Sequence, residues 1–168
     1  MNSYRVQDLV RNYEIGAPGT ITGVAYQADD DAMNAQFNAF QMKLCHTSLD
    51  ELTSSFSGNY DGNEPALVSE QDPLILDAVA DEWFDIPGFT PFRYDGVGNL
   101  LIEVRWMNDN GTDLETWVTN TDIYRLLYHK YLDEDEGILE MIYHRFRITI
   151  EFDQAVEEVS WGVIKAGF

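Results

Sequence analysis

The sequence has one cysteine, few basic residues and no long apolar run, and each of these features excludes a class of protein. Because Cys45 stands alone, neither an intrachain disulfide nor a cysteine-based zinc site can form. No stretch approaches the roughly 18 apolar residues that a membrane-spanning helix needs, so membrane insertion is not expected. Only 10 Lys and Arg residues stand against 30 Asp and Glu residues, a formal net charge of −20. Such a surface repels phosphate groups, and nucleic acid is not an expected partner.

The sequence also lacks the common local signatures of catalysis. It contains no GxSxG elbow, no glycine-rich phosphate loop and no HExxH motif. Ser48 follows His46 closely, but a serine nucleophile needs a positioned base and an oxyanion hole, and the sequence marks neither. His129 and His144 lie far along the chain, and His144 falls on the apolar side of its segment. We therefore expect a protein that is not an enzyme.

The apolar content predicts a folded chain with one core. Hydrophobic residues make up 45% of the 168 residues and aromatic residues 13%, which is too apolar for a disordered chain. The length suits one domain of ordinary size, and no linker or repeat divides it. We expect residues 1–168 to form a single domain.

Apolar and polar residues alternate along much of the chain, which is typical of strands with one buried face. Turn residues separate the alternating segments at short intervals. The pattern predicts an all-β fold, an antiparallel two-sheet β-sandwich resembling a jelly roll. The alternating segments are residues 20–27, 37–45, 99–106 and 138–152, together with a last one at Val159, Trp161 and Val163.

Two segments also fit helical spacing. Ser48 and Glu51 have the spacing of a capping box, which predicts one short helical turn over Ser48–Leu52. Residues 121–131 fit a helix and a strand equally well, and we favour a strand there because the neighbouring segments are strands.

Three acidic loops offer the oxygen ligands that Ca²⁺ prefers. These loops are residues 29–31, 59–64 and 133–136. In the middle loop, Asn59, Asp61 and Asn63 carry oxygen atoms at alternate positions. Gly62 permits a bend, and Glu64 adds a carboxylate. The loop therefore predicts a calcium site made of Asn59, Asp61, Asn63 and Glu64, with a solvated turn between strands as the alternative.

The four tryptophans divide into two kinds. Trp106 and Trp161 are in phase with apolar positions and are expected in the core. Trp83 and Trp117 stand in short polar segments and are the candidates for a sugar-binding surface, although a place in the core remains the alternative for both. Cys45 ends an apolar alternation, which indicates a small buried side chain rather than a reactive thiol.

Several stretches together resemble a β-sandwich domain of secreted modular bacterial surface proteins, some of which carry a PEP-CTERM sorting tail. The resemblance covers roughly residues 4–106, with a weaker match at 148–164. It rests on the stretches EIGAPGTIT (14–22), HTSL (46–49) followed by Phe56, TPFRYDG (90–96) and NLLIEVRW (99–106).

The resemblance implies an extracellular or cell-surface module without enzymatic activity, whose ligand is generally unassigned. We therefore expect a recognition or adhesion module that binds a glycan or protein ligand, with Ca²⁺ stabilising its loops. The alternative is a structural subunit of a surface layer, filament or virion that pairs with copies of itself through strand edges.

Overall fold

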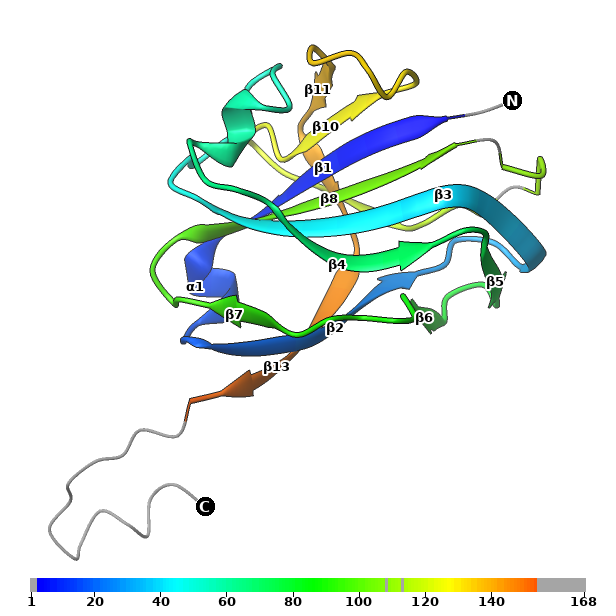
Figure 1. The fold of residues 1–168 in the computed structure, drawn as a ribbon, viewed down its shortest axis with the longest axis horizontal. Helices are drawn as coiled ribbons and strands as arrows, with labels where there is room; N and C mark the ends of the chain where they lie inside the picture. The colour runs from blue at the N-terminus through cyan, green and yellow to red at the C-terminus, as the bar shows by residue number, and fades with distance from the viewer. Residues whose placement is uncertain (1–2, 108, 113, 154–168) are drawn as a thin grey trace, which may run out of the picture.

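The fold is described by a computed structural model that covers residues 3–153 except Asn108 and Asp113. The last alternating segment, at Val159, Trp161 and Val163, lies outside these described residues. Strands predominate and every strand pairing in the described part of the chain is antiparallel (Figure 1). The prediction of an all-β antiparallel sandwich is confirmed.

The described strands form a larger sheet, a smaller sheet and a two-stranded ribbon. In the larger sheet the order is β11 (Ile138–Glu140), β10 (Leu126–His129), β1 (Tyr4–Val10), β8 (Asn99–Met107), β3 (Ala32–Thr47) and β4 (Ala66–Gln71), with β5 (Leu74–Ala78) on the other half of β3. In the smaller sheet the order is β13 (Phe146–Phe152), β2 (Gly19–Gln27) and β6 (Trp83–Asp85), with β7 (Phe92–Tyr94) also on β2. The ribbon pairs β9 (Val118–Asn120) with β12 (Ile142–His144).

Strand β8 is the centre of the larger sheet and is buried on both faces. It pairs with β1 on one side and β3 on the other. Leu100 and Ile102 point toward the smaller sheet and join the main core, whereas Leu101 points the opposite way into a second core. The predicted strand over residues 99–106 is confirmed, and so is the strand over 20–27, which is β2.

The main core is formed by side chains from both sheets. Figure 1 shows how the two sheets are arranged. Because side chains alternate across a strand, each sheet supplies every second residue to this core. The fully buried members include Ile21, Met42, Leu44, Tyr94, Leu100 and Ile102.

A second core lies on the outer face of the larger sheet. Residues 48–64, which we call the cover segment, fold over this face and bury Leu52 and Phe56 against Leu9, Leu101 and Leu127. Cys45 is buried in the same cluster, as predicted.

The helical turn predicted at Ser48–Leu52 is wrong. The described helices are α1 (Asn12–Ile15) and a 3₁₀ turn at Gly58–Tyr60 within the cover segment. Ser48 instead gives its hydroxyl and backbone N–H to the carboxylate of Asp61. A short polar side chain that bonds outside its own turn no longer caps a helix.

The alternation over residues 138–152 belongs to three strands rather than one. β11 joins the larger sheet beside β10, β12 pairs with β9, and β13 pairs with β2. Met141 is a bend between β11 and β12. Backbone hydrogen bonds from Thr121 to Met141 and from Arg145 to Trp117 extend the pairing of β9 with β12 at its two ends. Residues 121–131 contain β10, so the preference for a strand is confirmed over Leu126–His129.

We predict that Phe56→Ala loosens the cover segment. The Phe56 ring is fully buried and lies 4.4 Å from the guanidinium carbon of Arg5. Removing a buried ring leaves a cavity, and the free energy of unfolding should fall by about 3–5 kcal/mol. Urea denaturation measures this loss, and Val97→Ala, at a side chain that is 77% exposed, should change it by less than about 0.5 kcal/mol. Equal stability of the two variants would contradict the second core.

Candidate functional site

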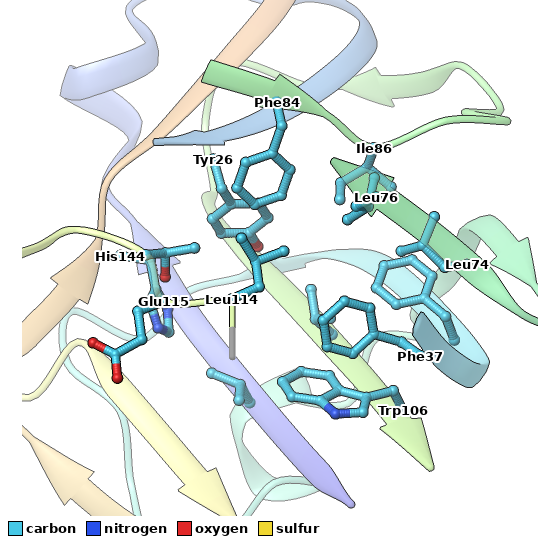
Figure 2. Close-up of a pocket in the computed structure, with 14 residues that line it drawn as sticks. Tyr26, Phe37, Leu74, Leu76, Phe84, Ile86, Trp106, Leu114, Glu115 and His144 are labelled. Atoms are coloured by element: carbon cyan, nitrogen blue, oxygen red, sulfur yellow. The ribbon is translucent and has the colours of Figure 1, made fainter. Parts of the chain in front are cut away.

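A cavity of about 350 Å³ lies between the two sheets. Figure 2 shows its lining side chains converging from opposite sides of the sandwich. The cavity is partly open to solvent, so a molecule can enter it from the surface. The lining residues are Val6, Tyr26, Phe37, Phe40, Leu74, Leu76, Phe84, Ile86, Val104, Trp106, Leu114, Glu115, Thr116 and His144.

Aromatic rings make up much of the cavity wall. Tyr26 on β2 and Phe84 on β6 are direct register partners, so both rings point inward, with ring centroids 6.2 Å apart. From the larger sheet, Phe37 and Trp106 meet edge to face at 5.4 Å. The alternation of strands β2, β6 and β8 therefore places rigid apolar surfaces on both sides of the space.

A buried ion pair adjoins the cavity. Asp8 on β1 points between the sheets and is 2% exposed. Its carboxylate accepts two hydrogen bonds from His144, one from the backbone N–H at 3.0 Å and one from Nδ1 at 2.9 Å. The two residues are 136 positions apart in the sequence, and strand β12 brings them together.

The surroundings of His144 favour its protonated form. Burial alone would lower the pKa of His144, but the charge and hydrogen bond of Asp8, with a smaller contribution from Glu140, outweigh burial and raise it. Tyr26 packs edge-on against the imidazole with centroids 6.1 Å apart. Burial and the nearby Asp8 carboxylate raise the pKa of Tyr26, so its phenol stays neutral.

His144 lies on the apolar face that the alternation of its segment predicts, whereas Asp8 is not among the predicted site residues. The available signal is its phase, because Asp8 alternates with Val6 and Val10, which line the cavity and the core. A charged residue at a core position of a strand is costly unless it is paired, and it therefore indicates a buried partner. The sequence does not say which partner.

A second buried carboxylate, Glu103, holds the cover segment in place. Its Oε2 atom accepts hydrogen bonds from Gln7 Nε2 at 2.8 Å, Tyr60 Oη at 2.6 Å and an Arg5 guanidinium nitrogen at 3.2 Å. Burial and Glu103 raise the pKa of Tyr60, and burial, Glu103 and Asp61 raise that of the Cys45 thiol to about 11. Cys45 is therefore a structural thiol rather than a nucleophile.

The structure brings the two candidate tryptophans to one surface. Trp83 is the register partner of Gln27, and the backbone N–H of Trp117 bonds to the carbonyl of the same residue. Asp81 links them further, because it accepts the Trp117 Nε1–H at 3.0 Å and its carbonyl accepts the Gln27 amide. Trp83 is 40% exposed and Trp117 is half-buried. We call residues 27, 81, 83 and 117 the tryptophan surface.

An arginine lies over each ring of the tryptophan surface. The guanidinium carbon of Arg147 is 5.4 Å from the centroid of Trp83, and that of Arg145 is 5.1 Å from that of Trp117. Such cation–π contacts stabilise this orientation of the rings. A role for Trp83 and Trp117 in ligand binding stays a prediction.

The predicted calcium residues have protein partners. Asn59 is fully buried, and its amide oxygen accepts hydrogen bonds from the N–H and hydroxyl of Thr53. Asp61 bonds to Ser48, whereas the Asn63 amide group donates to the carbonyl of His46. Glu64 is exposed. To bind calcium together with its neighbours, Asn59 would have to leave Thr53.

The other acidic loops show no metal cluster either. Asp135 accepts hydrogen bonds from Ser55 and Ser57, which hold its pKa below the usual range and tie its loop to the cover segment. Among the described residues, no group of three or more His, Cys, Asp or Glu side chains is close enough to hold a metal ion. Calcium binding stays a prediction.

No helix in the described part of the chain is long and apolar enough to cross a membrane. Comparison with protein families, with curated proteins and with solved structures finds no match for this chain.

We predict that Asp8→Asn lowers the pKa of His144, because burial then acts without the opposing carboxylate. An NMR titration of the imidazole ring measures this shift. In the native protein the folded-state pKa of His144 is raised, so its contribution to stability is full at low pH and is lost as the pH rises through that value. As a control, Asp30→Asn removes the same charge at an exposed position and should not shift the titration curve of His144. If Asp8→Asn also leaves that curve unchanged, the pairing of Asp8 with His144 is refuted.

Proposed function

We propose that this protein is a non-enzymatic binding module that holds a small, mainly apolar molecule in the cavity between its sheets. The observation that carries the proposal is the 350 Å³ space walled by apolar and aromatic side chains beside one buried polar pair. Small-molecule sites in proteins have this composition, with a few polar groups to orient the ligand.

The volume indicates the size of the ligand. An engineered apolar cavity of about 150 Å³ accepts benzene, so by simple scaling this space suits a molecule of about a dozen heavy atoms. A compound with two fused rings is of that size. The rigid aromatic walls favour a flat molecule that can contact the rings of Tyr26 and Trp106.

The site supports binding better than turnover. An aspartate that orients a histidine also occurs in hydrolases, where the histidine activates a nucleophile. Among the described lining residues, the hydroxyl groups belong to Tyr26 and Thr116. Burial and Asp8 keep the phenol of Tyr26 protonated, which makes it a poor nucleophile. For location, we propose the extracellular or cell-surface setting that the sequence resemblance implies.

Filling the cavity should weaken binding. Leu76 points into the cavity from β5, whereas its neighbour Ile75 is 56% exposed. The probe is 2-acetylnaphthalene, a flat compound with two fused rings. We expect Leu76→Trp to weaken its binding at least about tenfold, measured by calorimetry, because the new ring occupies the space of the ligand. Ile75→Trp adds the same ring on the other face of the same strand and should bind normally. Equal affinities of the two variants would place the ligand outside the cavity.

A glycan-binding role for the tryptophan surface is a second candidate function. One observation favours it, because two tryptophans 34 positions apart in sequence flank the same residue, Gln27. Aromatic rings stack on the apolar faces of sugars, and the amide of Gln27 and the carboxylate of Asp81 are groups that bond to hydroxyls. The arginines over the rings would have to move aside or bond to the sugar.

We expect Trp83→Ala and Trp117→Ala each to weaken binding to a polysaccharide in a pull-down series by about tenfold, since each removes a stacking surface. Tyr13→Ala is the matched control, because Tyr13 is an exposed aromatic residue on α1, away from this surface. The glycan role fails if the native protein binds no polysaccharide in the series, or if all three variants bind alike.

The self-assembling subunit stays a prediction. In the described part of the chain, β11 and β13 lie at the edges of their sheets, and edge strands can pair with a neighbouring copy.

A further inference from the structure

We infer that the ligand of the cavity between the sheets is a neutral molecule that presents a hydrogen-bond acceptor, such as a ketone carbonyl, to Nε2 of His144. The inference rests on the proposed function and adds the chemical class of the ligand. It is carried by the way in which the imidazole is held.

The imidazole has one nitrogen committed and one available. Nδ1 bonds to Asp8 at 2.9 Å, and the described residues give Nε2 no hydrogen bond. His144 is one of the lining residues (Figure 2), and Nε2 is the ring nitrogen that does not contact Asp8. In the protonated ring both nitrogens carry a proton, and Nε2 is then a donor that an acceptor on the ligand can satisfy.

The charges around the cavity favour a neutral ligand. Protonated His144 and ionised Asp8 cancel each other, whereas Glu115 on the lining and Glu140 near His144 are further acidic groups. An anionic ligand would meet this acidic surround and the net charge of −20. A cationic group such as an ammonium donates hydrogen bonds, so it cannot pair with the Nε2–H donor of protonated His144. A neutral acceptor avoids both costs and gains a charge-assisted hydrogen bond.

The same geometry makes the preference depend on pH. The groups that face His144 are Asp8 from β1, the ring of Tyr26 from β2, Glu140 at the end of β11 and Glu115 in the segment before β9. When the imidazolium loses a proton, Nδ1 keeps its own, because that proton is hydrogen-bonded to the Asp8 carboxylate. The proton is therefore lost from Nε2. Nε2 then carries a lone pair and becomes an acceptor, so the preference for an acceptor ligand is lost.

Matched probes test the inference on the native protein. 2-Acetylnaphthalene and 2-ethylnaphthalene have nearly the same shape, but only the first carries a carbonyl, and 2-naphthoate adds a charged variant. At about pH 6 we expect the ketone to bind about tenfold more tightly than the hydrocarbon, and at about pH 9 we expect the ratio to approach one. The carboxylate should bind more weakly than the ketone at both pH values.

A double variant removes the polar pair without leaving a buried charge. Replacing a buried ion pair by apolar residues often preserves folding. Asp8→Leu/His144→Leu should therefore keep its affinity for the hydrocarbon and lose the preference for the ketone. Asp30→Asn, which removes an exposed charge outside the lining and leaves the pair in place, should keep the preference. The pH series on the native protein decides the question even if the double variant does not fold.

The outcomes separate the inference from the proposed function. If the native protein binds ketone and hydrocarbon equally at low pH, the acceptor is refuted and the cavity function stands. Tighter binding of 2-naphthoate would refute the neutral ligand. If none of the probes binds, the proposed function itself is overturned.

Discussion

The fold depends on strand β8, which pairs with β1 along one edge and with β3 along the other and is buried on both faces. Its inner side chains build the core between the sheets, and its outer side chains build the second core under the cover segment. A strand with two buried faces has little freedom of register, because a slip by one residue would exchange the two sets. The register of β1 follows, and with it the side on which each polar residue of β1 lies.

Two buried carboxylates follow from this constraint, and their environments differ. Asp8 points inward and is paired with His144 beside an open space, whereas Glu103 points outward and is covered by Arg5, Gln7 and Tyr60. Both are 2% exposed. Burial of a charge is costly, so each carries its own set of donors. The donors to Glu103 connect the larger sheet to the cover segment. The bond to Asp8 uses only Nδ1 of His144 and leaves Nε2 for the proposed ligand.

The sequence predicts the strands with one clear period but not their grouping. Alternation identifies β2 and β8, because each is a continuous run with a turn before it. It fails at residues 138–152, where three short strands are in phase although they belong to different sheets. The polar neighbours of Trp83 leave both an exposed and a core position open for it, and the structure leaves it 40% exposed. The cavity could not be predicted from the sequence, since its volume depends on how side chains from distant segments, such as Leu74 and Trp106, pack together. Asp8 could be flagged by its phase, but its partner lies 136 residues away.

The hydrogen bonds at Glu103 also limit how this sequence can diverge. Oε2 serves three donors from β1 and the cover segment, and Oε1 has no partner among the described residues. A substitution that removes one donor leaves the buried charge with fewer hydrogen bonds. A substitution that removes the carboxylate leaves several buried donors without an acceptor. In homologous chains we therefore expect linked substitutions at positions 5, 7, 60 and 103. The four residues should be either all polar or all apolar. Such linked substitutions would identify distant relatives where overall identity has faded.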